Sequence, residues 1–162
     1  MASFILVGII IAGIAASILY GTYMYYESQP TFILAQAGQP IQIGQVVYTI
    51  GNIGNYKGDE DIKPTDIFFQ IRITAENIGT ETTLLSGGQF YLLNYNDKKY
   101  RAVYGEFSKE DLFNDDLKPN VPIIRITQFD IPFDEHARYR IGILPTKEQS
   151  SNDIGIICVQ NC

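Results

Sequence analysis

The sequence predicts an all-β protein, an antiparallel β-sandwich preceded by one N-terminal transmembrane helix. Residues 1–26 carry no charged side chain, so the rest of the 162-residue chain holds all 12 basic and 18 acidic residues. That rest contains short runs in which apolar and polar residues alternate. Glycine and proline separate the runs about every ten to fifteen residues, and no helical pattern lies between them, which excludes a parallel sheet.

The transmembrane prediction depends on residues 1–27. Residues 4–19 read FILVGIIIAGIAASIL, and about 20 helical residues cross a hydrocarbon core of about 30 Å. Aromatic side chains, which favour the headgroup level, gather at the C-terminal end of the segment. They are Tyr20, Tyr23, Tyr25 and Tyr26. We therefore expect residues 1–27 to form an uncleaved signal-anchor helix in contact with membrane lipid.

Two other kinds of N-terminal segment fit the residues less well. A cleaved secretory signal has a basic start and an apolar core of about 7–15 residues, and this segment has neither. A lipid anchor needs a cysteine just after the apolar run, whereas the cysteines are Cys158 and Cys162. Lys and Arg are nearly absent beside the segment, so the distribution of positive charge gives little indication of which end of the helix faces the cytoplasm. Because only a few residues precede the apolar run, we expect a single-pass protein whose folded domain is extracytoplasmic.

A stripe of small residues runs along the predicted helix. Gly13, Ser17 and Gly21 recur at every fourth position. Such a stripe allows two membrane helices to approach closely, but small residues are also common in membrane helices that have no such contact. The stripe is a helix-packing candidate, and both interpretations remain open.

After a linker at residues 28–40, we expect the sandwich to occupy residues 41–162. Val46, Tyr48 and Ile50 share one face of an alternating run, and a second run alternates over residues 69–75. Further strands are expected at residues 91–95, 100–104, 123–131, 139–143 and 154–159. One helical turn is expected between Ser108 and Leu117, where Ser108 is the cap and Asp111 follows three residues later.

Five segments together resemble a known family. In chain order they are GQVVYTIGNIG, FFQIRITAENIGTET, FYLLNYNDKKYRAV, DLKPNVPIIRITQFDIPFD and ARYRIGI. They are similar to the telokin-like, immunoglobulin-like domains of unknown function found outside the cytoplasmic membrane of prokaryotes, and we expect an archaeal source. The shared features are an Asn-x-Gly turn, a strand pair closing on an aromatic residue, a Leu-x-Pro turn and a final Phe-x-x-Pro strand, over about residues 41–145.

The resemblance implies an immunoglobulin-like sandwich and an extracytoplasmic location, with no catalytic residues to transfer. This chain departs from the family in two places. Asn120 follows the proline of Leu-x-Pro where the family usually has glycine, and Asn also tolerates left-handed geometry. The lipidated cysteine that tethers most relatives is missing after the apolar run.

Cys158 and Cys162 form a Cys-x-x-x-Cys motif. Two nearby cysteines in an oxidising compartment favour a disulfide, with two free thiols and a metal or redox site as the alternatives. A membrane helix followed by a sandwich with this motif is similar in outline to the binuclear copper domain of cytochrome oxidase subunit II. That centre also needs histidine and methionine ligands. His136 is the single histidine and the methionines are Met1 and Met24, so we expect no cofactor.

Other candidate sites are weaker. His136, in FDEHARY, is either a pH-sensitive contact or metal ligand, or a solvated or salt-bridged side chain, and its loop setting favours the latter. No Gly-x-Ser-x-Gly motif supports a hydrolase. Two acidic runs could supply part of a calcium shell, although neither has EF-hand spacing and most such runs are solvated. They are Asp59, Glu60, Asp61 with Asp66, and Glu110, Asp111 with Asp115, Asp116.

These observations predict a non-enzymatic, single-pass membrane protein whose extracytoplasmic domain makes protein–protein contacts, as an accessory subunit of a larger membrane or cell-surface assembly. Its partners would meet the helix stripe and the sandwich, and a homo-oligomer or filament is compatible with this. The net charge of −6 excludes a nucleic-acid partner. The alternative function is an archaeal type IV pilin-like filament subunit or an archaellum stator component, which would need a processed leader. The third and least favoured function is a copper or redox domain that uses Cys158 and Cys162.

Overall fold

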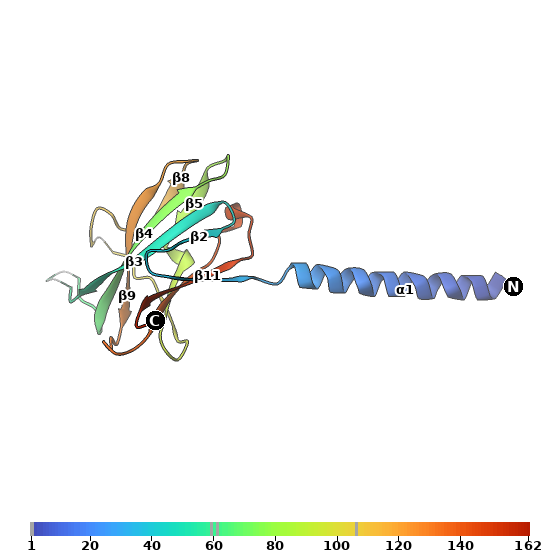
Figure 1. Ribbon diagram of the computed structural model, residues 1–162, viewed down its shortest axis with the longest axis horizontal. Helices are drawn as coiled ribbons and strands as arrows, with labels where there is room; N and C mark the ends of the chain where they lie inside the picture. Colours follow the sequence, from blue (N-terminus) through green and yellow to red (C-terminus); the bar gives the residue numbers. More distant parts are fainter. Residues whose placement is uncertain (1, 59, 61, 106) are drawn as a thin grey trace. The chain divides into compact units, whose positions relative to one another are not determined.

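The structure of the protein is a computed structural model that describes residues 2–58, 60, 62–105 and 107–162, with side chains described at Gly8 and from residue 13 onward. The chain divides into two compact units, Met1–Pro30 and Thr31–Cys162. Figure 1 shows the first as a helix and the second as a body made of strands.

The first unit consists of one helix, α1 (Ala2–Glu27). Two of its hydroxyl side chains bond within the helix, since Ser17 and Thr22 donate to the carbonyls of Gly13 and Ile18 at 2.8 and 2.9 Å. The predicted helix is therefore confirmed. Among the residues described with their side chains, no helix is long and apolar enough to cross a membrane. That residues 1–27 span the bilayer stays a prediction.

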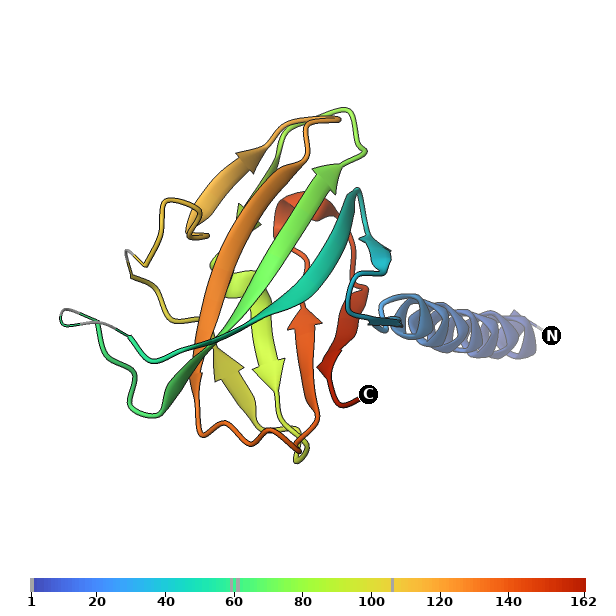
Figure 2. The same cartoon turned by 60° about the vertical axis from the view of Figure 1, so that its left-hand side comes forward.

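The second unit contains two main sheets. One has four strands in the order β2 (Pro40–Ile43), β3 (Val46–Tyr56), β4 (Ile67–Asn77) and β9 (Ile123–Ile131), all antiparallel. The other has five strands in the order β1 (Phe32–Gln36), β11 (Ile154–Gln160), β10 (Tyr139–Ile143), β6 (Phe90–Leu93) and β7 (Lys99–Arg101). In Figure 2 the long strands β3, β4 and β9 lie in front of the five-stranded sheet. The predicted sandwich is confirmed.

Shorter elements close the ends of the sandwich. A two-stranded ribbon pairs β5 (Thr83–Ser86) with β8 (Asn114–Leu117). There are also two single 3-10 turns, η1 (Gly87–Gln89) and η2 (Lys147–Gln149). The core between the sheets is formed by the alternate residues that the sequence predicts, including Val46, Tyr48 and Ile50 of β3 and the inward residues of β4.

Two of the turns that carry the family resemblance have defined geometry. Asn77 is fully buried at the end of β4, where its Oδ1 accepts the Gly79 N–H at 2.9 Å and its Nδ2 donates to the carbonyls of Glu81 and Leu117 at 2.7 and 2.9 Å. Asn120 adopts a left-handed conformation with a φ of 57°, as its position after Pro119 predicts.

A tyrosine at the start of β10 fixes the preceding corner. The hydroxyl of Tyr139 accepts the Asp134 N–H at 2.9 Å and donates to the carbonyl of Pro132 at 3.5 Å. This backbone contact of a tyrosine at the start of a strand resembles the tyrosine corner described for immunoglobulin-type sandwiches.

Three predictions need correction. Residues 32–36, assigned to the linker 28–40, form β1. The helical turn predicted from Ser108 to Leu117 is wrong, because only a tight turn forms after Ser108 and residues 114–117 form β8, whose partner β5 supplies the backbone hydrogen bonds. The sandwich is also not wholly antiparallel. The edge strand β1 runs parallel to its neighbour β11.

Candidate interaction surface

The outer face of the five-stranded sheet is apolar at its centre. Alternation along each strand sends every second side chain away from the core. In β1 these are Phe32, Leu34 and Gln36, and the two apolar ones, Phe32 and Leu34, have exposed fractions of 59% and 73%. They lie opposite Ile154 and Ile156 of β11 in the parallel ladder. The outward apolar residues, which we call the apolar face, are Phe32, Leu34, Tyr91, Leu93, Leu144, Ile154 and Ile156.

A hollow lies in the middle of this face, above Gly142. Gly142 lies between Ile156 of β11 and Tyr91 of β6 in the sheet. A Cβ built at Gly142 would meet nothing closer than 3.8 Å, so the core does not require glycine there. The missing side chain leaves a depression of about 210 Å³, bounded by Lys99 and by every residue of the apolar face except Leu34. A glycine inside a central strand commonly marks a place where another molecule approaches the backbone closely.

Basic side chains border the apolar face. Lys99 and Arg101 point outward from β7 beside Leu93 and Tyr91. Arg138 and Arg140 border a second depression of about 240 Å³, which also contacts Leu34 and Ile156. Arg140 forms an ion pair with Asp97 in the turn before β7. We call Lys99, Arg101, Arg138 and Arg140 the basic rim.

The outer face of the four-stranded sheet has a different character. On β4, one of its two central strands, the outward residues from position 70 onward are polar. They are Gln70, Arg72, Thr74 and Glu76. Apolar side chains also occur on this face, because Ile124 of β9 lies opposite Thr74 and is 49% exposed. The outer face of the four-stranded sheet thus carries a more mixed set of side chains than the apolar face.

The predicted cysteine pair lies at the border of the apolar face. Cys158 and Cys162 are joined as a disulfide, with a Cα–Cα distance of 5.9 Å. Cys158 points outward from β11, opposite Gln36 of β1, and both cysteines border the depression beside Arg138. The single histidine, which a binuclear copper site would need as a ligand, contacts Glu135.

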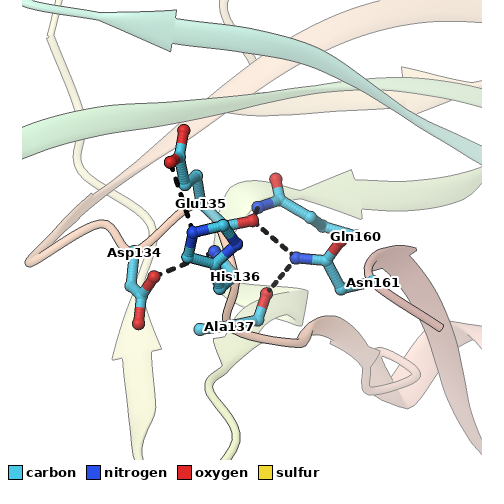
Figure 3. A network of polar contacts seen from close by, with 6 residues as sticks. All are labelled: Asp134, Glu135, His136, Ala137, Gln160 and Asn161. Atoms are coloured by element: carbon cyan, nitrogen blue, oxygen red, sulfur yellow. Dashed lines mark hydrogen bonds and ion pairs between the residues drawn. The ribbon is translucent and has the colours of Figure 1, made fainter.

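The loop before β10 holds the end of the chain in place (Figure 3). The side-chain amide of Asn161 donates to the carbonyls of Glu135 and Ala137 at 2.7 and 2.9 Å. Gln160 donates to the Glu135 carbonyl at 3.3 Å. His136 is on the outside of this network, where its side chain is 88% exposed and its Nε2 lies 3.4 Å from Glu135 Oε1. Of the two interpretations of His136, the structure therefore agrees with a solvated side chain that is weakly paired with Glu135.

The acidic runs do not converge on a cation site within the described part of the chain. Asp59 and Asp61 lie outside the described residues. Asp111 accepts the N–H groups of Phe107 and Ser108 at 2.6 and 3.0 Å, and Asp115 accepts two hydrogen bonds from Arg125 at 3.0 and 2.8 Å. No group of three or more His, Cys, Asp or Glu side chains suited to a metal occurs among the described residues.

The residues of the helix stripe and the tyrosines all lie on α1. The stripe residues Gly13, Ser17 and Gly21 are exposed, and the space around both glycines is open. The side chains at 20, 23, 25 and 26 are exposed as well. At 3.6 residues per turn they point in different directions around the helix, as a headgroup belt would. Their roles in helix packing and at a membrane interface stay predictions.

A buried polar cluster joins segments distant in the sequence. The hydroxyl of Tyr48 accepts hydrogen bonds from the amides of Gln89 and Gln149 at 3.3 and 2.8 Å. Gln89 also donates to the carbonyl of Leu144 at 2.9 Å, and Gln149 to that of Leu84 at 3.0 Å. Burial raises the pKa of Tyr48 to about 12, although the two amide donors act in the opposite direction. The cluster ties η1 and η2 to β3, which is a structural role.

The fold defines a small β-sandwich domain, and the outer side of its five-stranded sheet carries the apolar face and the basic rim. The model of a family described as Domain of unknown function (DUF4352) matches residues 35–151. The chain belongs to this family. No curated protein matches the chain significantly.

Several solved structures share the fold. The yjhA protein of Bacillus subtilis is 17% identical with a TM-score of 0.60, over 78% of this chain and 99% of that one. The secreted protein MPT63 of Mycobacterium tuberculosis is 12% identical with a TM-score of 0.59, over 76% and 95%. The candidate lipoprotein ycdA of Bacillus subtilis is 12% identical with a TM-score of 0.59, over 77% and 39%. At these identities the similarity establishes the fold alone.

The alternation of residues does not reveal the apolar face. Phe32 and Leu34 fall within the expected linker, and Ile154 and Ile156 within an expected strand whose outer face has no assigned role. A signal was present in the residues, because IGIICV at 154–159 and FILA at 32–35 are apolar at successive positions. A strand that is apolar on both faces has both faces covered or leaves one available for binding.

Proposed function

We propose that the protein is a non-enzymatic docking domain, anchored to the membrane by residues 1–27, with its sandwich outside the cytoplasm. The observation that carries the proposal is the apolar face with its basic rim. A contiguous apolar patch on the surface of a small domain usually marks a site of protein or membrane contact.

Anchoring is supported by the sequence of the helix. No charged residue occurs before Glu27, and each Asp, Lys or Arg at the centre of a membrane helix would oppose insertion by about 3 kcal/mol. The ring of tyrosines at the C-terminal end adds an interface signal. An anchored protein needs contacts that hold its domain in position, and the apolar face offers them.

An extracytoplasmic location is supported by two lines of reasoning. Proteins that share the fold include one described as secreted and one described as a candidate lipoprotein. A disulfide between Cys158 and Cys162 is also favoured outside the cytoplasm, where thiols are not kept reduced.

A binding role, rather than catalysis, is supported by the surroundings of the reactive side chains. His136 is solvated, and the carboxylates of Asp111 and Asp115 are occupied by structural hydrogen bonds. The two depressions on the outer face are lined mainly by apolar and basic groups. Such a lining suits recognition of a surface more than proton transfer.

Membrane fractionation tests the proposal. After washing of membranes with alkaline carbonate, the full chain should remain in the pellet, and a variant with Ile14→Arg and Ile18→Arg should move to the supernatant. In spheroplasts, added protease should digest the sandwich without lysis. Release of the wild-type chain by carbonate would contradict anchoring, and digestion only after lysis would place the domain in the cytoplasm. Tyr95→Arg, on an exposed turn, serves as the control for added charge.

A further inference from the structure

We infer that the occupant of the apolar face is the surface of a lipid bilayer rich in anionic headgroups, on which the sandwich lies through the outer side of its five-stranded sheet. The inference rests on the proposed function, because it names the partner of the docking surface described there.

Charge is the first argument. The chain as a whole has a net charge of −6, yet four basic side chains border the apolar face, and Asp97, the partner of Arg140, is the acidic group paired with them. Anionic lipids attract Lys and Arg within a Debye length of the surface. Apolar side chains surrounded by basic ones are also the pattern of structures that lie in the membrane interface.

The length of the connection is the second argument. Helix α1 ends at Glu27 and β1 begins at Phe32, so five residue steps separate them. At about 3.5 Å for each extended residue, this connection reaches at most about 18 Å. If the tyrosines mark the headgroup level, β1 cannot leave the neighbourhood of the bilayer. The two most exposed side chains of the apolar face, Phe32 and Leu34, belong to this strand.

A second copy of the chain is a poorer occupant. Packing two such faces around a twofold axis brings the same patch of each copy together. Both basic rims would then belong to one interface, which would hold Lys99, Arg101 and Arg138 of each copy. Like charges placed together in an interface oppose association. A bilayer meets the same groups with opposite charge.

The chain contains no tryptophan, so one introduced tryptophan reports on one place. The reporter variant is Leu34→Trp, on the apolar face, and the matched control is Thr74→Trp, on the outer face of the four-stranded sheet. The full-length variants are reconstituted in vesicles of phosphatidylcholine, with or without phosphatidylglycerol, whose acyl chains carry bromine. Phe32→Trp is the second reporter if Leu34→Trp changes the melting temperature.

The inference predicts that bromine in anionic vesicles quenches the fluorescence of Leu34→Trp about twofold more than that of Thr74→Trp, because interfacial side chains lie about 5–10 Å into the headgroup and acyl boundary. Replacing Lys99 and Arg101 by Gln should lower the ratio of docked to undocked domains by about 30-fold, since each basic group near an anionic surface contributes a factor of about five. Lys109→Gln with Lys118→Gln removes the same charge elsewhere and should leave the quenching unchanged.

Three results would overturn the inference. Equal quenching of the reporter and control variants, in a protein that floats with the vesicles, would leave the anchor intact and refute lipid docking alone. Protection of the Leu34→Trp reporter from acrylamide in native membranes, without quenching in pure lipid, would identify a protein as the occupant. A protein that neither floats nor binds anionic vesicles would refute both proposals. Conversely, a protein released by carbonate whose Leu34→Trp reporter is still quenched by anionic vesicles would support lipid docking while refuting the anchor.

Discussion

Leu34 of β1 lies directly opposite Ile156 of β11 in the parallel ladder, and both side chains point away from the core. The next pair in the same ladder, Ala35 and Ile157, packs into the core. Two neighbouring isoleucines, 156 and 157, therefore have opposite environments, so substitutions at these positions can test the proposed binding surface separately from the stability of the fold.

This relationship predicts different effects for two similar substitutions. Ile157→Ala should lower the free energy of unfolding by about 3 kcal/mol, since it leaves a cavity in the core. Ile156→Ala should lower it by about 1 kcal/mol or less, because no core cavity is formed. Urea denaturation of the full chain in detergent measures both. Similar losses for the two variants would show that the apolar face is packed against something within the protein.

The buried turn at Asn77 gives a second prediction. Asn77→Ala removes one acceptor and two donated hydrogen bonds at a fully buried position, so the free energy of unfolding should fall by about 3 kcal/mol. Asn94 is a matched control, because its Oδ1 accepts the N–H groups of Asn96 and Lys98 in a hairpin turn at the surface. Asn94→Ala should have an effect of about 1 kcal/mol or less. Equal effects in chemical denaturation would contradict a special role for the Asn-x-Gly turn.

The sequence predicts the centre of the sandwich well, because alternation along β3 and β4 depends only on which residues avoid water. Val46, Tyr48 and Ile50 are buried as their spacing requires. The strand β8 could not be predicted in this way. Its residues, NDDL, have low strand propensity, and they form a strand because β5 pairs with them and Arg125 binds Asp115.

The candidate surface was harder to predict, because it depends on the neighbours of each strand. β1 lies beside β11 although these two strands stand near opposite ends of the chain. Periodicity gives the face of a residue within its own strand, but not the strand that lies next to it. Phe32, Tyr91 and Ile156 therefore become one patch only in the folded sheet. The cysteines were simpler, since a separation of four residues brings Cys158 and Cys162 together locally.

The cysteine pair yields a third prediction. In the native protein, alkylation before reduction should label no thiol, and alkylation after reduction should label both. Reduction should lower the free energy of unfolding by about 2 kcal/mol at most, because the chain-entropy estimate for so short a loop is small. The double variant Cys158→Ser, Cys162→Ser should match the reduced protein. Two thiols labelled without reductant, or stoichiometric copper in the purified protein, would contradict the disulfide.

Tyr48 gives the last prediction, which concerns alkaline pH. Burial raises its pKa from 10.0 to about 12 in the folded protein. Between these values the unfolded chain has lost the phenolic proton and the folded protein still holds it, so stability falls as pH rises. The stabilising contribution of neutral Tyr48 is complete below about pH 10 and is lost by about pH 12, a decrease of about 3 kcal/mol.

Urea denaturation at several pH values between about 9 and 12 tests this directly. Tyr48→Phe should be less stable at neutral pH by about 2 kcal/mol, because the amides of Gln89 and Gln149 lose their shared acceptor. Its stability should then decline less steeply than that of the wild type above about pH 10, since the group that titrates late is gone. Tyr95→Phe, at an exposed ring, is the matched control and should keep the wild-type slope. If Tyr48→Phe shows the same decline as the wild type, another group causes the alkaline loss, and the buried cluster does not hold the proton of Tyr48.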